Sequence, residues 1–228
     1  MSFRFLGVIP ARGGSKRVKR KNIRILNGKP LIYYSIDAAK CSSRLNHFVV
    51  SSEDKEILDT ALKYLPNENI LERPISISGD HVRNTETLKH AVNSLQDKSD
   101  QPFTHVVLLQ PTSPFRTTED IDNAINIFEK SGCKTLASVS PAIKKRDNIL
   151  KRRIDNNLCC DLIQSESPFE FMRYNAAIYI VEINYLFSET SFKDDLQSYY
   201  EMSDVNSIDV DTEIDLAMAE FLMTYNFK

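Results

Sequence analysis

Short apolar segments alternate with amphipathic segments along most of this chain, and this alternation limits the folds open to it. The clearest apolar segment, THVVLLQ, lacks polar positions between its apolar ones, which is typical of a strand buried on both faces. We expect strands at Phe3–Pro10, His47–Ser51, Asn69–Glu72, Thr104–Gln110, Lys134–Ser140 and Asn175–Val181, and helices at Pro30–Cys41, Glu53–Tyr64, Asn84–Leu95, Thr117–Lys130 and Thr212–Thr224. Strands that alternate with helices predict an α/β fold, a Rossmann-like, mostly parallel sheet flanked by helices, in one domain over residues 1–228.

One stretch, Ala142–Arg173, departs from this pattern. It is rich in charged residues, and its apolar residues have little periodicity. We interpret it as an inserted arm or hairpin, and we expect a small dimerisation arm at residues 142–168. A plain surface loop is the alternative, and the sequence alone does not decide between the two.

The composition argues against several classes of protein. A net charge of −2 and a pI of about 6.1 do not suggest a general nucleic-acid or membrane partner. No apolar run is long enough for a transmembrane helix, and the apolar start of the chain is too short for a signal peptide. No metal-binding spacing relates the cysteines, Cys41, Cys133, Cys159 and Cys160. We therefore expect free thiols and a cytoplasmic protein.

The segment Ile9–Asn22, which reads IPARGGSKRVKRKN, directly follows the first expected strand. Six of the 29 Lys and Arg residues lie in it. Backbone N–H groups of a Gly-rich turn can surround an anion, and Arg12, Lys16 and Lys21 can add charge-assisted hydrogen bonds. The order of residues fits neither GxxxxGK[ST] nor GxGxxG. Because ligands bind beside the carboxyl ends of strands in such sheets, we interpret the segment as a polyphosphate site rather than an idle basic turn.

Five short motifs follow one another along the chain, and the first lies inside this basic segment. They are Pro10–Lys16 with Lys21 and Asn22, Glu72–Pro74 with Gly79 and Asp80, Leu109–Arg116, Arg173–Ile180, and Ile208–Glu213. Together they resemble the motifs of the acylneuraminate cytidylyltransferases, the CMP-sialic acid synthetases, a family that includes legionaminic and pseudaminic acid cytidylyltransferases. The resemblance covers essentially the whole chain.

The resemblance implies a nucleotide-diphospho-sugar transferase fold and an enzyme that couples CTP to a nine-carbon 2-keto sugar acid. Mg²⁺ assists in that family, and pyrophosphate leaves. The residues that the resemblance assigns to the nucleotide are Arg12, Gly14, Ser15, Asn22, Arg73 and Asn84, and those that it assigns to catalysis are Lys16, Lys21 and Asp211. We expect the two lysines to stabilise charge in the transition state, because phosphoryl transfer depends mostly on positioning and electrostatics.

Asp209 and Asp211 flank Val210. In an extended segment, residues i and i+2 point to the same side. Two carboxylates on one side suit Mg²⁺, which takes oxygen ligands and keeps some of its waters. The resemblance likewise implies a metal site at Asp209 and Asp211. The alternative is that Asp211 only assists the cap of the last helix.

The sugar-binding residues that the resemblance implies are Gln110, Arg173, Asn175, Tyr179 and Phe192. A guanidinium matches the geometry of the sugar carboxylate, so Arg173 is the candidate for pairing with it. Both aromatic residues have an alternative role as core side chains.

Departures from the motifs leave the exact substrate open. Tyr174 and Ala176 stand where many members carry proline and glycine. Legionaminic, pseudaminic and the eight-carbon acid Kdo therefore remain alternatives to neuraminic acid. A nucleotide-binding protein without turnover is the alternative from another class. Family members are commonly dimers, so we expect a homodimer.

Overall fold

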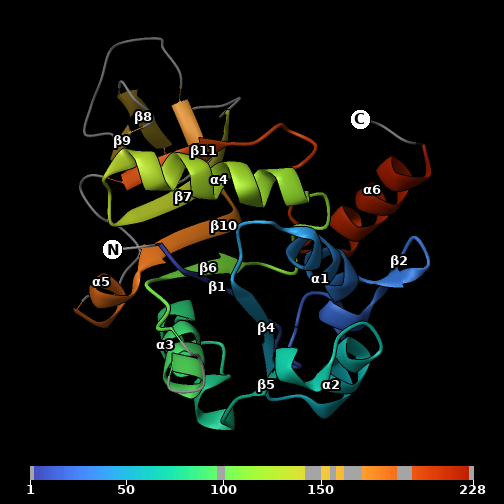
Figure 1. Cartoon of the computed structure of the whole chain (residues 1–228). Coiled ribbons are helices and arrows are strands. Elements are labelled where there is room, and N and C mark those ends of the chain that lie inside the picture. The colour runs from blue at the N-terminus through green and yellow to red at the C-terminus, as the bar shows by residue number, and fades with distance from the viewer. Residues whose placement is uncertain are drawn as a thin grey trace.

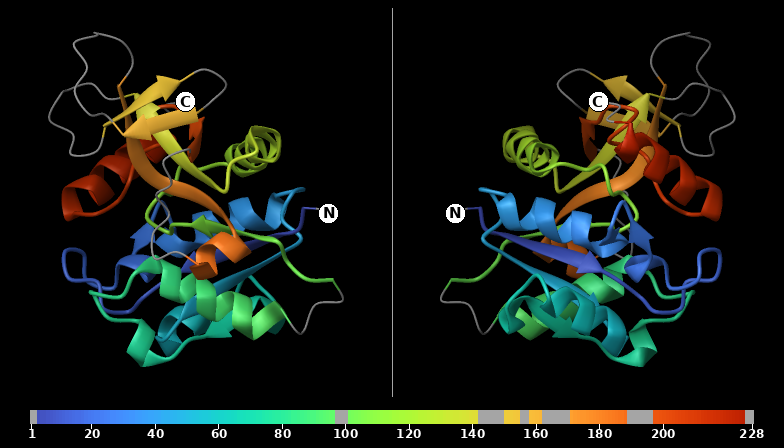
Figure 2. Two further views of the ribbon diagram at one scale, coloured as in Figure 1. Left: turned by 90° about the vertical axis from the view of Figure 1, so that its left-hand side faces the viewer. Right: turned by 90° about the vertical axis from the view of Figure 1, so that its right-hand side faces the viewer.

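The computed structural model describes residues 3–96, 101–141, 150–154, 158–161, 171–188 and 197–225. In these residues, helices lie on both faces of one large sheet (Figures 1 and 2). The predicted α/β fold with a mostly parallel sheet is confirmed.

The large sheet has the strand order β5-β4-β1-β6-β10-β7-β11-β9-β8. Its strands are β1 (Phe5–Pro10), β4 (His47–Ser52), β5 (Ile70–Glu72), β6 (His105–Leu109), β7 (Thr135–Pro141), β8 (Leu150–Ile154), β9 (Leu158–Asp161), β10 (Phe171–Glu182) and β11 (Gln197–Glu201). β5, β4, β1 and β6 run parallel, and so do β7 and β11, whereas β10 is antiparallel to both neighbours, β6 and β7. A separate short pair joins β2 (Ile25–Leu26) to β3 (Lys29–Pro30).

The helices are α1 (Leu31–Cys41), α2 (Lys55–Leu62), α3 (Asn84–Leu95), α4 (Thr118–Ser131), α5 (Ile183–Ser188) and α6 (Glu213–Thr224), with short 3₁₀ helices η1 (Lys21–Ile23), η2 (Asn67–Asn69) and η3 (Ile75–Ile77). The strand β1 shows why helices are needed on both faces. Its Phe5 and Ile9 pack with α1, α2 and α4, whereas Leu6 and Val8 pack with α3 and α5. Alternate side chains of a strand point to opposite faces, so an all-apolar strand must be covered twice.

Helix α6 covers neither of these cores. Its Leu216 and Ala219 pack with Val18, Leu26 and Leu31, beside the basic segment and the β2–β3 pair. The Thr212 side chain accepts a hydrogen bond from the Asp215 amide, and the Asp215 carboxylate accepts from the Thr212 amide, which forms a capping box. The helix therefore begins at a fixed point, directly after the Asp209–Asp211 segment.

Strand β10 is irregular where it leaves β6. Its pairing with β6 ends at Ile178 opposite Leu109, and its register with β7 shifts between Tyr174 and Tyr179. Ala176 lies in this bulge with φ of 62°. This left-handed conformation costs a residue other than glycine roughly 1 kcal/mol, which explains why the similar motif carries glycine there.

The segment Asp209–Asp211, treated above as extended, is not part of a strand, and the structure contains a parallel strand, Gln197–Glu201, that was not expected. The sequence QSYYE does not predict a buried strand, because only two of its five residues are aromatic and none is aliphatic. Within the expected arm at 142–168, the backbones of β8 and β9 pair antiparallel, and the rest of that stretch, like Phe192, lies outside the described residues.

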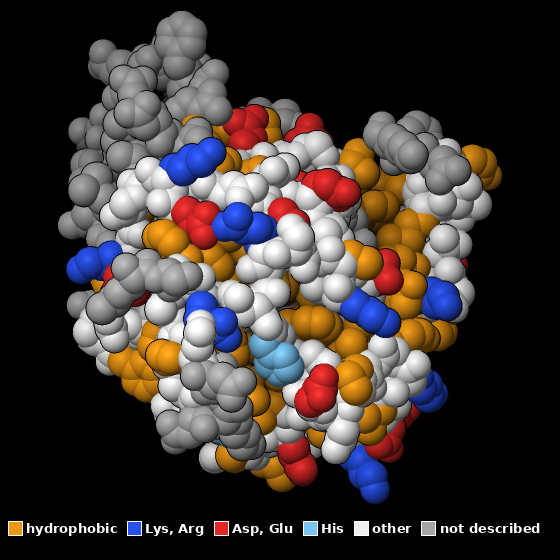
Figure 3. Space-filling view, in the orientation of Figure 1, with side chains coloured by type: hydrophobic (Ala, Val, Ile, Leu, Met, Phe, Trp, Pro, Cys, Tyr) orange, Lys and Arg blue, Asp and Glu red, His pale blue; other side chains and the backbone are white. Residues whose placement is uncertain are grey.

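Across the part of the chain that the structure describes, no helix combines the length and the apolar character needed to cross a membrane. On the face drawn in Figure 3, basic and acidic side chains are interspersed rather than gathered into a continuous basic patch.

Candidate active site

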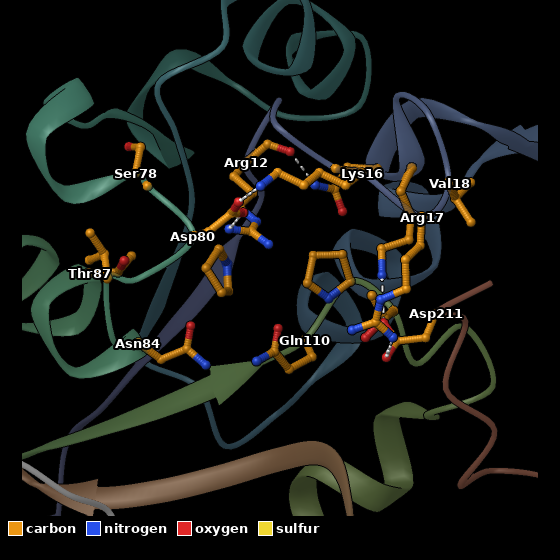
Figure 4. Close-up of a pocket in the computed structure, with 18 of the residues that line it drawn as sticks. Arg12, Lys16, Arg17, Val18, Ser78, Asp80, Asn84, Thr87, Gln110 and Asp211 are labelled. Carbon is orange, nitrogen blue, oxygen red and sulfur yellow. Dashed lines mark hydrogen bonds and ion pairs between the residues drawn. The ribbon is translucent and has the colours of Figure 1, made fainter.

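A pocket of about 540 Å³ lies at the carboxyl ends of the parallel strands (Figure 4). Its walls come from the segment after β1, the segment from β5 into α3, the residues that follow β6, the bulge of β10, and the segment before α6. The lining residues are Pro10, Arg12, Ser15, Lys16, Arg17, Val18, Lys21, Asn22, Arg73, Ile77, Ser78, Gly79, Asp80, Val82, Asn84, Thr87, Gln110, Pro111, Thr112, Ala176, Asp209 and Asp211. Chain segments far apart in sequence thus meet at the edge of the sheet where ligands of such folds bind.

The outer part of the basic segment pairs with one carboxylate across the pocket. Arg12 Nη1 lies 2.6 Å from Asp80 Oδ1, and Lys16 Nζ forms an ion pair with the other oxygen, Oδ2 (Figure 4). The hydrogen bond from Lys16, together with both positive charges, lowers the pKa of Asp80. Asp80 therefore stays ionised, and its carboxylate pairs with two cations that could otherwise bind an anionic ligand.

The inner part of the segment contacts Asp211, which together with Asp209 forms an acidic pair. Lys21 lies in η1, and its Nζ donates to the Val210 carbonyl at 3.0 Å and to Asp211 Oδ1 at 2.9 Å. Arg17 Nη1 donates to Asp211 Oδ2 at 2.9 Å. The side chain of Lys21 is 14% exposed, against 80% for Lys16, so Lys21 is held in one place whereas Lys16 extends into solvent.

Asn22 and Glu53 fix the shape of the basic segment through hydrogen bonds to its backbone. The buried Asn22 donates from Nδ2 to the Arg12 carbonyl at 2.9 Å. Glu53 Oε1 accepts from the Gly13 amide at 2.8 Å, and its Oε2 accepts from Arg73 at 3.0 Å. Glu53 therefore links the basic segment to the far wall. This role could not be recognised from the sequence, because an acidic residue at position 53 is typical of the first turn of a helix.

Arg73 is buried at 5% exposure, and each of its three guanidinium nitrogens donates a hydrogen bond. Besides Glu53, it donates to Ser78 Oγ at 3.0 Å and to Thr87 Oγ1 at 3.2 Å. Burial lowers the pKa of Arg73, and the negative charge of Glu53 partly opposes that shift. Arg73 thus shapes the wall that ends at Asn84, whose amide faces that of Gln110 across the pocket (Figure 4).

Asp209 and Asp211 both line the pocket, although their segment is not a strand. Val210 between them is fully buried against Val18 and Leu31, which turns both acids outward. Burial raises the pKa of Asp209, with a hydrogen bond to Thr112 acting the other way. Burial acts on Asp211 as well, but the hydrogen bond and charge of Lys21, and the charge of Arg17, outweigh it and lower the pKa of Asp211.

The donor set at this pair fits Mg²⁺. Asp209 Oδ1 is buried and has no hydrogen-bond partner among the described residues. Burying an ionised carboxylate oxygen without a hydrogen-bond partner costs free energy unless a cation binds it. Mg²⁺ binds proteins through one or two carboxylates and takes its other ligands from water and substrate phosphates. In the described ranges, no cluster of three or more His, Cys, Asp or Glu side chains could hold a metal, and Asp209 and Asp211 are two carboxylates close in sequence that both line this pocket.

Of the sequence-predicted site residues, ten line the pocket: Arg12, Ser15, Lys16, Lys21, Asn22, Arg73, Asn84, Gln110, Asp209 and Asp211. Gly14 lies in the same loop but does not line the pocket. The structure adds several residues that the sequence analysis did not assign, among them Arg17, Asp80, Thr87 and Thr112. Asp80 and Thr112 lie inside the quoted motifs and Arg17 in the basic run, so a signal for these three was present.

Three residues predicted on the sugar side do not line this pocket. Arg173 Nε donates to Ser140 Oγ at 3.1 Å. Asn175 is buried and bonds both Ser138 and Ser207 through its side chain. Tyr179 is mostly buried in the core on the α3 side, and burial raises the pKa of its hydroxyl. Their roles toward a sugar stay predictions.

Comparison with known proteins decides the family. A model of the cytidylyltransferase family matches residues 6–222. The chain belongs to the cytidylyltransferases. It is therefore a nucleotidyltransferase, an activity for which a pocket lined by cations and carboxylates is suited.

Similar curated proteins narrow the group within the family. The chain is 37% identical to a CMP-N,N'-diacetyllegionaminic acid synthase of Legionella pneumophila, over 98% of this chain and 97% of that protein. It is 39% identical to a pseudaminic acid cytidylyltransferase of Campylobacter jejuni, over 58% of this chain and 56% of the relative. It is 28% identical to an N-acylneuraminate cytidylyltransferase of Escherichia coli, over 96% of this chain but 52% of that longer protein.

Two solved structures share the fold. A CMP:2-keto-3-deoxy-manno-octonic acid synthetase complexed with CTP superposes with a TM-score of 0.77 at 16% identity, covering 98% of this chain and 100% of the other. A 4-diphosphocytidyl-2C-methyl-D-erythritol synthase from Anaerococcus prevotii gives a TM-score of 0.62 at 15% identity, over 97% of this chain and 96% of the other. These likenesses show that the fold of this chain also occurs in solved structures.

Proposed function

We propose that this cytidylyltransferase transfers CMP from CTP to the anomeric hydroxyl of a nonulosonic, sialic-type acid. The hydroxyl oxygen forms a bond to the α-phosphorus, the bond from that phosphorus to the bridging oxygen breaks, and pyrophosphate leaves. The hydroxyl proton passes to water. One observation carries the proposal: a single pocket brings Lys21, Arg17, Asp209 and Asp211 together, with Arg12 and Lys16 at its mouth.

The cations divide into two groups by burial. Arg12 and Lys16 at the mouth are suited to hold the outer phosphates, since among the described residues their ion pairs are with the exposed Asp80 alone. Lys21 is suited to the α-phosphate, where charge changes during the reaction, because a fixed cation needs no reorganisation at that moment. Ser15 and Asn22 complete the nucleotide side as hydrogen-bonding groups.

We further propose Asp209 and Asp211 as the carboxylates that hold Mg²⁺. When bound, the metal would neutralise phosphate charge and orient the triphosphate. Asp209 offers the oxygen that lacks a partner among the described residues. Asp211 would share its negative charge between the metal and its pairs with Lys21 and Arg17, which leaves part of both positive charges for the substrate.

The acid that we propose to test first is of the legionaminic type. The relative of that activity matches nearly the whole of both chains, whereas the pseudaminic relative matches over little more than half. Tyr174 and Ala176, where the similar motif has proline and glycine, lie in the bulged part of β10 and could account for a preference among acids. We also propose a cytoplasmic homodimer with partner contacts through residues 142–168.

Pyrophosphate release tests the proposal. The purified chain is incubated with CTP and Mg²⁺ and, in turn, with N-acetylneuraminic, N,N'-diacetyllegionaminic, pseudaminic and Kdo acids. We expect release with one nonulosonic acid and little with Kdo. Release with Kdo alone would replace the proposed substrate class, and CTP binding without release from any acid would favour a nucleotide-binding protein without turnover.

A further inference from the structure

The strands β6 and β10 separate at the floor of the pocket. We call the place where they diverge the fork, and one buried side chain lies between its two strands. Their ladder ends where Leu109 faces Ile178. The next residues along each strand are Gln110 and Ala177, and beyond this point the chains diverge. Gln110 lines the pocket with its side chain, and Ala176 lines it from the bulge. The distance between these two walls therefore depends on how the fork is held.

Arg116 holds both branches of the fork. Its Nη1 donates to the Gln110 carbonyl at 2.9 Å and to the Ala177 carbonyl at 3.0 Å, so one nitrogen joins the residues that would have formed the next rung of the ladder. Its Nη2 donates to Ser35 Oγ of α1 at 2.6 Å, and that hydroxyl also donates to the Gln110 carbonyl at 3.2 Å. Three separate elements thus converge on one guanidinium.

This arrangement is costly, and the cost argues for a specific role. Arg116 is 2% exposed, and its Nε is buried without a hydrogen-bond partner among the described residues. Burial lowers its pKa to about 10, with only the charge of Asp120 opposing the shift. A buried cation that bonds mostly neutral acceptors contributes little net stability compared with an apolar replacement. The guanidinium does supply a rigid, planar set of hydrogen-bond donors, which a lysine does not.

We propose that Arg116 is a positioning residue that sets the spacing between Gln110 and the Ala176 bulge, and thereby the fit of the acidic sugar. This inference rests on the proposed function for the identity of the ligand. Arg116 does not line the pocket, so it acts through the two backbone segments that it joins. The nucleotide wall of Arg73 and Asn84 is held by other contacts, so the effect should fall on one substrate only.

The test compares R116M and R116K with the wild-type chain in the pyrophosphate assay. We expect R116M to raise the KM for the sugar acid at least tenfold while the KM for CTP changes less than threefold, and R116K to recover part of the loss. Asn69→Ala serves as the control, because buried Asn69 bonds the Phe48 carbonyl at 2.6 Å away from the pocket. This variant should lower Tm without changing either KM. Unchanged KM for the acid in R116M, or an equal rise for CTP, would overturn the inference.

Backbone hydrogen exchange separates this inference from the proposed function. We expect faster exchange in R116K than in the wild type at residues 110–116 and 176–178, with α3 as the unchanged reference. R116K retains the charge, so it also decides the question where R116M fails to fold. If the wild type uses none of the acids, the proposed function fails, and exchange at these residues still tests the role of Arg116. Unaltered exchange there would show that Arg116 does not hold the fork.

Discussion

The two sides of the pocket differ in how their residues reach it. The proposed nucleotide side consists of residues 12–22 and 73–87, which follow parallel strands at their carboxyl ends. The proposed acid side consists of residues 110–112 and strand β10. Among the described residues predicted for the sugar side, only Gln110 lines the pocket. Seven residues predicted for the nucleotide side line it: Arg12, Ser15, Lys16, Lys21, Asn22, Arg73 and Asn84.

Topology explains the difference. A residue in a connection after a parallel strand faces the ligand crevice by position alone, so its type is a sufficient guide. A residue inside β10 has a neighbouring strand on each side, and its side chain is directed by the local register. Asn175 shows the consequence, since its polar atoms are used within the sheet and toward Ser207 rather than in the pocket.

The largest expected effect comes from Lys21→Ala on the nucleotide side. If Lys21 acts at the α-phosphate as proposed, removing this fixed cation should lower kcat by about 10²–10³-fold, as loss of one transition-state donor does elsewhere. The measurement is steady-state pyrophosphate release, with circular dichroism as the check on folding. Lys19→Ala is the control, since Lys19 is exposed in the same segment and does not line the pocket. A wild-type rate in Lys21→Ala would remove Lys21 from the mechanism.

The acidic pair stands between the two sides, and Asp209→Asn tests it. The amide keeps the shape but removes the charge from the oxygen without a partner in the described structure, so we expect about 10²-fold lower activity and a Mg²⁺ titration shifted to higher concentration. Asp204→Asn, at an exposed position before the segment, should behave as the wild type. An unchanged Mg²⁺ titration in Asp209→Asn would contradict the metal assignment.

Arg73→Lys should separate the two sides by substrate. A lysine keeps the charge but cannot reproduce the donors to Ser78, Thr87 and Glu53, so the nucleotide wall loses its shape. We expect about a tenfold higher KM for CTP and an unchanged KM for the acid. Arg44→Lys, at an ion pair with Glu129 outside the pocket, is the matched control. A rise in the KM of the acid alone would reverse the assignment of the two sides.

The smallest effect is expected from Asp80→Asn. Its carboxylate competes for Arg12 and Lys16, and exposed pairs of this kind are weak, so CTP should bind about two- to fourfold more tightly. The difference should shrink as salt rises, because screening weakens the competing pair in the wild type. Titration calorimetry with CTP at two salt concentrations measures it. Weaker CTP binding in the variant would mean that Asp80 supports the nucleotide rather than competing for its site.

The sequence predicted those helices and strands whose apolar residues have a regular spacing. Helix α3 begins and ends at the expected residues, because its apolar spacing is regular. The strand at Gln197–Glu201 was missed, since a polar sequence is buried there by its neighbours β7 and β9 rather than by its own composition. Asp209 and Asp211 do share a side as expected, but the cause is the burial of Val210 rather than a strand.

The site could be predicted where charge alone identifies a residue. The motifs indicated the basic segment and the acidic pair, both of which are local in sequence. Links such as Glu53 to Arg73 and Gly13 could not be predicted, because they depend on which segments the fold brings together. Arg116 belonged to a recognised motif, yet its role needed the geometry of the fork.

The position of β10 has a consequence for how the protein is made. β10 lies between β6 and β7, yet both of those strands precede it in the chain. During synthesis from the amino terminus, β6 and β7 cannot join until residue 182 has been added, and each presents an open edge meanwhile. Such non-local pairing is slow, and unpaired edges are prone to aggregation. The floor of the pocket, which needs the bulge of this same strand, should therefore be among the last parts of the molecule to form.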